Sequence, residues 1–287
     1  MEIVLAQGGL CAEVRGVDLG APVADGAFKK ISDALHNYAV LLFRDQHITP
    51  EAQVAFSRRL GEIRVSMLSQ YSLPGLPELQ IISNIVENGR AIGIRDAGTM
   101  WHTDGAYLPK PDMYTQLYAK EVPHDDAGVA LGDTYFTNTA NACDALPDDI
   151  KQAIDGRRAV FSFPYYYEQL RAAGKLGRAD LTPEQKAKLP DVIHPIVRTH
   201  PVTGRKCLFA TESFAYAIVG MADSEARPLL ARLFAHLKEP RFIYRHHWRV
   251  GDVLTWDNCA TQHIATFDYG ERRRLMHRVG IQGGVPV

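Results

Sequence analysis

The residues most able to do chemistry are His102 and Asp104, which stand two positions apart in the segment WHTD (101–104). In an extended strand, side chains at i and i+2 leave the same face, so this imidazole and this carboxylate would converge on one point. Imidazole and carboxylate groups both bind divalent metal ions. Two ligands do not make a site, and a three-residue pattern with one free position is common by chance, so a third ligand must come from elsewhere in the chain.

The third candidate ligand is His263. The chain has 11 histidines, and most need no function, because a histidine in a strand is more often a half-exposed or hydrogen-bonded core residue. His246 and His247 illustrate this, since adjacent strand residues point to opposite faces and cannot chelate one ion together. His263 follows a turn signal at 257–258 and precedes Arg274 by eleven positions. Two imidazoles and one carboxylate, with the remaining positions open, form the facial triad of non-haem Fe(II) oxygenases.

The composition is that of an ordinary globular protein of 287 residues, with 46% hydrophobic and 23% charged residues. A formal net charge of −1 gives no reason to expect nucleic acid or an anionic membrane surface as a partner, so we expect a small-molecule ligand. The four cysteines form no CxxC pair, which fits neither a disulfide scaffold nor a zinc ribbon. The chain has no signal-peptide pattern and no run of about 18 apolar residues, so we expect a soluble, unprocessed, cytoplasmic protein.

The elements that would position these ligands are mostly short strands with turn signals between them. Many strands with few βαβ alternations favour a sandwich or jelly roll over a doubly wound sheet. No linker divides the chain, so we expect one domain over 1–287, with a helical or irregular insertion at about 140–190. The expected helices span 25–38, 50–60 and 224–238, and the expected strands span 39–45, 78–85, 114–122, 194–210 with a hairpin turn at PVTGRK, 241–250, 253–256 and 273–282.

Several further motifs occur in one order along the chain. They are GVDL (16–19), LLFRDQ (41–46), WHTD (101–104), GDTYF (132–136), HPIVRTHPVTGRKCLF (194–209), WDN (256–258) and RRLMHRV (273–279). In these motifs the chain resembles the Fe(II)- and 2-oxoglutarate-dependent dioxygenases of the taurine dioxygenase and 2,4-dichlorophenoxyacetate dioxygenase (TauD/TfdA) group, and the resemblance covers nearly the whole length. It implies a mainly β core, a distorted double-stranded β-helix (jelly roll, cupin-like), with flanking α-helices.

The resemblance also implies roles for individual residues. His102, Asp104 and His263 would be the iron ligands, and O₂ would need a vacant position on the metal. Thr134 and Arg274 would bind the distal carboxylate of the cosubstrate 2-oxoglutarate. Family members also lead us to expect a homo-oligomer, a dimer or tetramer.

Arg278 matches a position that meets the anionic group of the substrate in the taurine enzyme. By strict alternation in the last strand, Arg274 and Arg278 would share one face and lie roughly 13 Å apart, which suits two anions in one cavity. The planar fork of arginine pairs with a carboxylate through two hydrogen bonds. We expect Arg272 or Arg273 in the same RRR run to be solvated.

The expected substrate pocket departs from that of the taurine enzyme. Leu73 stands at about the position of a sulfonate-contacting histidine, and Gly98 stands where that enzyme has an asparagine, so taurine is not the expected substrate. Tyr107 and Phe214 fall at positions that wall the pocket in the relatives, and aromatic walls suit an apolar body. They are equally ordinary core residues. The loop 123–132 and the tyrosines 165–167 have no assigned role, and three adjacent tyrosines cannot all face one site.

The predicted function is hydroxylation of a small organic anion with a hydrophobic body, coupled to decarboxylation of 2-oxoglutarate to succinate and CO₂. Where the hydroxylated product is unstable, the net result would be cleavage. Two alternatives remain open. The same cofactors could support desaturation or another iron-dependent oxidation, or the chain could be a non-catalytic jelly-roll protein that binds a metal or ligand.

Overall fold

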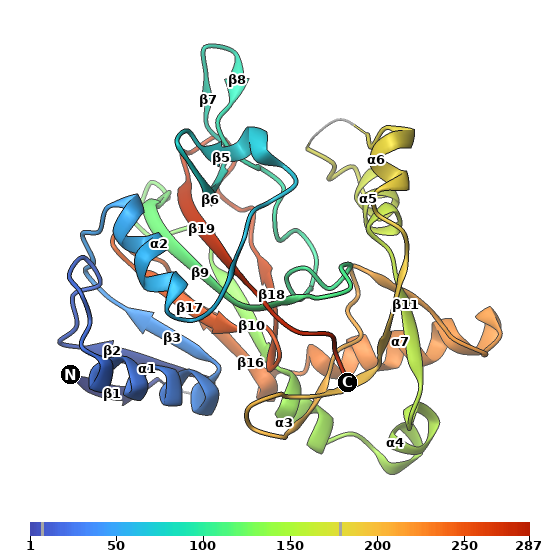
Figure 1. Cartoon of the computed structure of the whole chain (residues 1–287). Helices are drawn as coiled ribbons and strands as arrows, with labels where there is room; N and C mark the ends of the chain where they lie inside the picture. Colours follow the sequence, from blue (N-terminus) through green and yellow to red (C-terminus); the bar gives the residue numbers. More distant parts are fainter. Residues whose placement is uncertain (7–8, 178–179) are drawn as a thin grey trace.

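A large, mostly antiparallel sheet forms the centre of the molecule (Figure 1). It is seen in a computed structural model that describes residues 1–6, 9–177 and 180–287. The strand order is β1-β2-β3-β17-β9-β19-β6-β5, with β4 also paired to β19, and only β2 and β3 run parallel. The bounds are β1 Glu2–Leu5, β2 Cys11–Arg15, β3 Val40–Phe43, β4 Ile63–Arg64, β5 Ser72–Leu73, β6 Leu76–Ser83, β9 Asp112–Glu121, β17 Val253–Asp257 and β19 Leu275–Gln282.

A second sheet of three strands packs against one face of the large sheet. Its order is β16-β10-β18, with bounds Ile243–His246, Thr134–Asn138 and Thr261–Ala265. Phe136 of β10 meets Trp256 of β17 with ring centroids 5.4 Å apart, and Leu117, Leu254 and Met276 of the large sheet join the same core. Two sheets with a shared apolar core form the predicted jelly-roll architecture.

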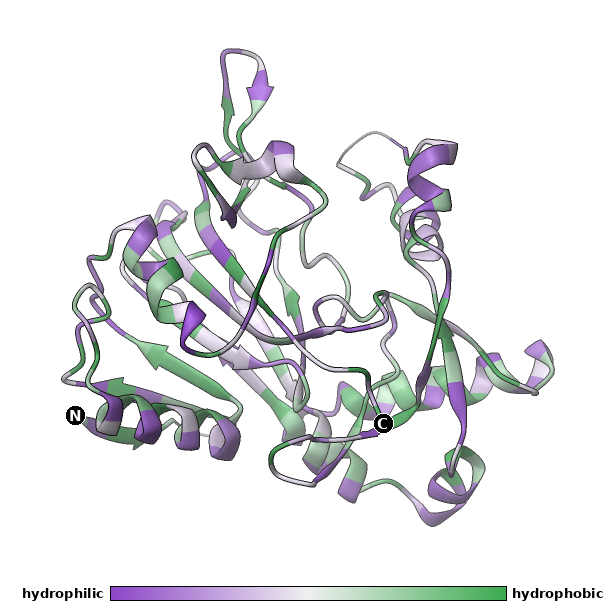
Figure 2. Cartoon of the chain, in the orientation of Figure 1, coloured by the Kyte–Doolittle hydropathy of each residue, from purple (hydrophilic) through white to green (hydrophobic). Residues whose placement is uncertain are grey.

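Helices α1 (Asp25–Tyr38) and α2 (Pro50–Arg58) cover the other face of the large sheet (Figure 1). The apolar stripe of α1 buries Ile31 and Leu35 against Leu41 and Phe43 of β3. Figure 2 shows β3 hydrophobic along its length, in keeping with its position between two layers. The hydroxyl of Thr49 accepts a hydrogen bond from the backbone of the first turn of α2, as expected for an N-cap followed by proline. The predicted bounds of α1 are confirmed.

The segment between β10 and β12, where the insertion is predicted, shares one hydrophobic core with later parts of the chain, including residues of β14, β15 and α7. It contains α3 (Thr139–Asp144), α4 (Asp148–Ile154), α5 (Phe163–Ala172) and α6 (Pro183–Ala187), but also a strand, β11 (Arg158–Phe161). β11 pairs with β12 (Val192–Pro195) and β15 (Ala215–Ile218), and α7 (Asp223–Leu237) packs on β15. A four-residue strand just before an N-capped helix leaves too short a pattern to be recognised. The prediction of a single domain over 1–287 stays a prediction.

The remaining elements are short. The hairpin at PVTGRK is confirmed, since β13 (Val197–Thr199) pairs with β14 (Lys206–Leu208). The strand expected over 241–250 is only β16, because a 3-10 turn, η2 (Pro240–Phe242), precedes it. A small hairpin, β7 (Val86–Glu87) and β8 (Arg90–Ala91), and the turn η1 (Ser69–Tyr71) complete the set. None of the helices among the described residues combines the length and the apolar character needed to cross a bilayer.

Candidate active site

His102, Asp104 and His263 lie together between the two sheets. The backbone N–H of His102 donates to the carbonyl of His263 at 3.0 Å, and the N–H of His263 donates to the carbonyl of His102 at 2.8 Å. Nε2 of His102 lies 3.5 Å from Oδ1 of Asp104, and Nε2 of His263 lies 3.9 Å from Oδ2. One ligand atom from each residue is thus within 4.8 Å of the other two, which is an arrangement that could hold a metal ion. The structure brings together the three ligands predicted from the sequence.

The orientation of His102 and Asp104 is fixed by neighbours outside the triad. Nδ1 of His102 lies 2.9 Å from the carbonyl of Met100, which leaves Nε2 facing Asp104. Oδ2 of Asp104 accepts a hydrogen bond from the Thr115 hydroxyl at 2.7 Å. Asn258 donates to that same hydroxyl oxygen at 2.9 Å, and its own amide oxygen accepts from Trp256 at 3.1 Å. The sequence marked WDN only as a motif, and Thr115 was missed because nothing local shows that its partner is Asp104.

The charges at the triad suit a divalent cation. Burial, helped by His102, lowers the pKa of His263 to about 3, so this imidazole is neutral near pH 7. Burial alone would raise the pKa of Asp104, but Arg278 and the two histidines outweigh it and hold that pKa well below its ordinary value. A neutral imidazole and an ionised carboxylate are the states that bind metal.

A second cluster, His200, Asp257 and Cys259, is equally close together but serves the structure. Nε2 of His200 lies 2.8 Å from Oδ2 of Asp257, and Nδ1 accepts from the backbone N–H groups of Val202 and Thr203 at 3.1 Å each. Both ring nitrogens are therefore engaged. Burial raises the pKa of the Cys259 thiol, so it is protonated and unsuited to bind a metal.

Arg274 is a buried cation, 4% exposed. Within the described part of the chain no carboxylate pairs with it, and its Nε has no hydrogen-bond partner. Nη2 reaches the carbonyl of Gly132 at 3.5 Å, and the guanidinium lies 5.8 Å from the ring centre of Tyr269. Burial lowers the pKa of Arg274. A guanidinium desolvated without an anion is costly, so this position would be stabilised by a bound carboxylate.

Gly132 has no side chain, and this leaves space for the side chain of Arg274. Its φ of +80° is in the left-handed region, and a Cβ built on it would lie 3.0 Å from Nε of Arg274. The loop 123–132, which had no assigned role, closes through a hydrogen bond from Leu131 N–H to the carbonyl of Pro123 at 2.8 Å and so delivers Gly132 to this place. Thr134 follows in β10, buried, with its hydroxyl oxygen accepting from Trp248 at 3.0 Å.

β10 connects this cation to the triad. Phe136 pairs in register with His263 and stacks on it, with ring centroids 5.7 Å apart. Thr134 precedes Phe136 by two positions in β10, so it shares the face of Phe136 at a step of about 7 Å. Gly132 lies just before the strand begins.

Arg274 and Arg278 do not share one regular strand, contrary to the expectation from the sequence. The last strand was expected over 273–282, but β19 begins at Leu275, and its pairing with β9 shifts register between Leu275 and Met276. Arg274 therefore lies outside the regular strand, and strict alternation cannot place it relative to Arg278. Arg272 and Arg273 are both exposed and paired with Asp126 and Glu121, as expected of a solvated run.

Arg278 lies beside the triad, as expected of a residue near the substrate, but it already has partners. Its Nη2 is 3.1 Å from Oδ1 of Asp104 and 3.1 Å from Oδ2 of Asp112, and Nη1 donates to Gln80 at 3.4 Å. Its side chain remains 20% exposed. Asp112 was missed because a lone aspartate after a proline reads as a turn residue.

An aromatic wall stands next to His102. The Phe214 ring lies 6.5 Å from the His102 ring, Tyr107 lies 5.1 Å from Phe214, and Phe163 lies 4.3 Å from Tyr107. Phe163 is the first residue of FPYYY, and the tyrosines that follow it diverge. Tyr166 contacts Phe214, whereas Tyr165 packs on Tyr216.

Leu73 is not brought to this wall. It packs in a separate cluster with Leu79, Ile81 and Val279. Val279 leaves β19 on the face opposite to Arg278, because neighbouring residues in a strand alternate. Gly98 does lie near the triad, and a Cβ built on it would be 3.8 Å from the His102 ring.

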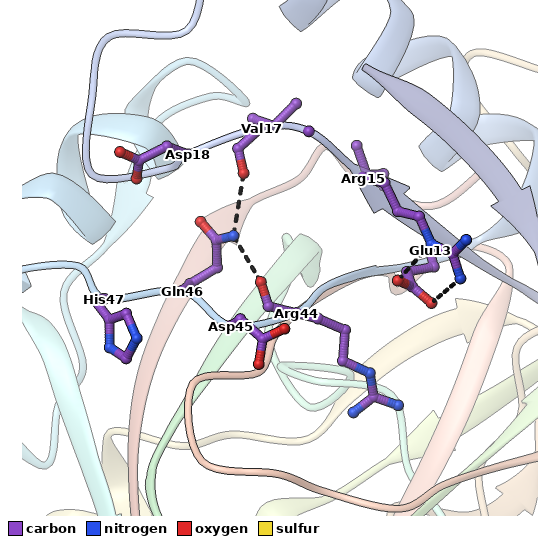
Figure 3. Close-up of a pocket in the computed structure, with 10 residues that line it drawn as sticks. Glu13, Arg15, Val17, Asp18, Arg44, Asp45, Gln46 and His47 are labelled. Atoms are coloured by element: carbon purple, nitrogen blue, oxygen red, sulfur yellow. Dashed lines mark hydrogen bonds and ion pairs between the residues drawn. The ribbon is translucent and has the colours of Figure 1, made fainter.

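A polar groove of about 720 Å³ lies elsewhere, between the end of β2 and the segment after β3 (Figure 3). Several of its polar and charged groups pair with one another or with nearby residues. Arg15 pairs with Glu13 at 2.8 Å, Arg44 pairs with Asp252 at 2.6 Å, and the Gln46 amide donates to two backbone carbonyls. Neither of the two clusters of described residues that could hold a metal ion lines this groove, so the triad is the candidate active site.

Known proteins match nearly the whole chain. The family described as "Taurine catabolism dioxygenase TauD, TfdA family" matches residues 4–279. The 2,4-dichlorophenoxyacetate dioxygenase of Cupriavidus pinatubonensis is 31% identical, covering 96% of this chain and 95% of that protein. The sulfate ester dioxygenase of Pseudomonas putida is also 31% identical, covering 98% and 89%. The solved structure of AAD-2 with Mn(II) and N-oxalylglycine is 31% identical, has a TM-score of 0.81 and covers 99% and 98%. The predicted jelly-roll fold is confirmed.

Proposed function

The chain belongs to the TauD, TfdA family of dioxygenases, and on that premise we propose that it oxidises a C–H bond of a small organic anion with a hydrophobic body. It is a 2-oxoglutarate-dependent non-haem iron dioxygenase, using Fe(II), 2-oxoglutarate and O₂. Its relatives act on different small organic molecules, including a phenoxyacetate and sulfate esters. The proposal therefore concerns which residues do the work and what kind of substrate they admit.

The convergence of His102, Asp104 and His263 is the observation that carries the proposal. Two nitrogen ligands and one oxygen ligand, with no thiolate, suit Fe(II) and leave coordination positions open. These three residues would hold the iron, which would supply the activation of O₂ that is coupled to oxidation of 2-oxoglutarate to succinate and CO₂. The chain's own residues keep the triad in the binding state: Thr115 holds the Asp104 carboxylate, and the Met100 carbonyl holds the His102 ring.

Arg274 and Thr134 would hold the distal carboxylate of 2-oxoglutarate. Support comes from the unpartnered Nε of Arg274, which a carboxylate would satisfy. The spacing along β10 also fits, because Thr134 stands about 7 Å from the position of Phe136 at His263. A five-carbon dicarboxylate could span from the triad to Arg274 along this strand.

The substrate would lie between the aromatic wall and Arg278. Tyr107, Phe163 and Phe214 offer an apolar surface next to His102. The exposed part of the Arg278 guanidinium would meet the anionic group, and the charge would keep the substrate in one orientation. An aryloxyalkanoate or an alkyl sulfo compound fits this arrangement better than taurine, which has no hydrophobic body.

Succinate formation and oxygen uptake test the proposal, measured with Fe(II), 2-oxoglutarate and a panel of aryloxyalkanoates, sulfate esters, sulfonates and N-acyl amino acids. We expect turnover coupled to one or more anions with a hydrophobic body. Equal succinate formation with neutral analogues would contradict an anionic substrate. Analysis of the organic product separates hydroxylation or cleavage from desaturation. The expectations of a homo-oligomer and of a cytoplasmic location stay predictions.

A further inference from the structure

Asp112 is a buried carboxylate, 3% exposed, held between two arginines. Its Oδ1 pairs with Nε of Arg64 at 2.5 Å, and its Oδ2 pairs with Nη2 of Arg278 at 3.1 Å. Arg278 uses the same Nη2 to reach Asp104 at 3.1 Å. Four side chains, Arg64, Asp112, Arg278 and Asp104, thus form a row of alternating charge that ends at the triad.

The place of the Asp112 carboxylate is built into the strands around it. Gly280 of β19 faces it, and a Cβ built on Gly280 would lie 2.8 Å from Oδ2 of Asp112. The backbone N–H of Asp112 donates to the carbonyl of Asp104 at 3.2 Å, which ties the two acids together through the main chain. Gly105, with φ +67°, also approaches this backbone, since its Cβ would lie 3.1 Å from the Asp112 nitrogen. These contacts fix the carboxylate on one side of Arg278.

The row is electrically neutral by itself, with two positive and two negative groups. The charge balance of the row changes once Asp104 coordinates a divalent cation. The negative charge of Asp104 is then shared between the cation and Arg278. The two charges of the cation and the two of 2-oxoglutarate cancel. Among the groups that contact the row, or that would contact the cation and 2-oxoglutarate, three arginines, Arg64, Arg274 and Arg278, then stand against two carboxylates, Asp104 and Asp112, which leaves an excess of one positive charge. Asp133 and Asp268 also act on the charge of Arg274, but Asp133 is itself paired with Arg245 and Asp268 is exposed to solvent.

We propose that Asp112 is a specificity-determining residue that limits the substrate of this enzyme to a single negative charge. The inference rests on the proposed function, in which Arg278 meets the substrate anion. A monoanion neutralises the excess positive charge, whereas a dianion brings its second charge against the fixed carboxylate of Asp112. Without that carboxylate, the excess would be two positive charges and a dianion would fit.

Asp112→Asn tests the proposal, since it removes the charge and nearly keeps the shape. The substrates are three compounds with one hydrophobic body: phenoxyacetamide, phenoxyacetate and phenoxymethylphosphonate, compared at pH 8, where the phosphonate is a dianion. We expect the ratio of dianion to monoanion kcat/KM to rise about 100-fold, the effect of one charge ~6 Å away at an effective dielectric constant of ~20. The matched control is Asp126→Asn, the same change in an exposed residue paired with Arg272, which should leave the ratio unchanged.

A second readout does not depend on turnover. Calorimetric dissociation constants of the two anions, measured with protein loaded with Mn(II) and N-oxalylglycine, the pair seen in a solved relative, should shift in the same direction in Asp112→Asn. Asp112→Glu, which restores the charge, should return the ratio of dianion to monoanion binding toward that of the wild type.

Gly280→Ala keeps the charge of Asp112 but pushes its carboxylate away from Arg278. This variant should raise the same ratio, and it can be measured even if Asp112→Asn does not fold. A binding ratio that stays within twofold of wild type in Asp112→Asn or Gly280→Ala would overturn the proposal. Absence of succinate with all three compounds, together with a shifted binding ratio, would instead count against the proposed substrate.

Discussion

Replacing Arg274 with methionine separates binding of the cosubstrate from stability of the empty protein. Methionine keeps an unbranched chain in the space beside Gly132 and removes the guanidinium. The guanidinium is 4% exposed, its Nε has no hydrogen-bond partner, and among the described residues no carboxylate pairs with it. We expect two opposite effects: weaker binding of 2-oxoglutarate and a more stable empty protein.

The expected changes in affinity and in stability follow from two features of Arg274: it has no carboxylate partner among the described residues, and it would pair with the carboxylate of 2-oxoglutarate. Removing one partner of a desolvated charge pair costs about 2–5 kcal/mol, which is about 1.5 to 3.5 decades in the dissociation constant of 2-oxoglutarate. The empty protein loses a buried cation whose burial is unfavourable, against some lost packing on Tyr269. We expect a net gain of about 1 kcal/mol, and so a Tm higher by ~2 °C.

The assay is anaerobic calorimetry of 2-oxoglutarate binding to the Fe(II) protein, together with thermal unfolding of the metal-free protein. Arg272→Met is the matched control, because that arginine is exposed and paired with Asp126, and it should change neither quantity. The KM of the organic substrate should move far less than that of 2-oxoglutarate. An unchanged affinity for 2-oxoglutarate would refute the role of Arg274, and a large fall in Tm would show that the guanidinium stabilises the fold instead.

Three other outcomes are expected. His102→Ala, Asp104→Ala and His263→Ala should each abolish succinate formation and Mn(II) binding while the metal-free protein still unfolds cooperatively; activity in any of them would show that the ligand assignment is wrong. Thr115→Val removes the hydrogen bond to the Asp104 carboxylate and should weaken Mn(II) binding about 10-fold, so an unchanged dissociation constant would argue against this support. Burial lowers the pKa of His277 from 6.5 to about 4. As the pH falls, the His277 ring therefore takes up a proton in the unfolded chain before it does so in the folded protein. The folded state loses about 3 kcal/mol of stability between pH 6.5 and about pH 4, and this stability is fully present above pH 6.5. The free energy of unfolding of His277→Gln should depend less on pH over this range, and a curve parallel to that of the wild type would contradict the shift.

That His102, Asp104 and His263 lie together could be predicted, because their pattern shows in the sequence itself. The spacing of His102 and Asp104 indicates one shared face, and His263 stands out from the other histidines by its turn and by the arginine that follows. The bounds of α1 were predictable for a similar reason, since an apolar residue at every third or fourth position is a property of the segment alone.

Residues whose partners are distant in the sequence were not predictable. The partners of Asp112 are Arg64 and Arg278, and the partner of Thr115 is Asp104. The residues next to Asp112 and Thr115 in the sequence do not indicate these pairings. The start of β19 was placed too early because alternation cannot reveal the register shift next to Leu275. Leu73 was assigned to the pocket by comparison with relatives, whereas the packing of its own strand places it with Val279.

The backbone bridge between His102 and His263 has a consequence for how the protein acquires its metal. The two segments meet through mutual hydrogen bonds although most of the second sheet and the whole insertion lie between them in the chain. Contacts between such distant segments form late, after the entropy of closing a long loop has been overcome. A partly folded chain would thus have the His102 and Asp104 pair without the third candidate ligand, His263, and we would expect it to bind iron weakly. Metal loading would then be a test of complete folding, and a nascent or truncated chain that ends before His263 would not produce oxidising chemistry in the cell.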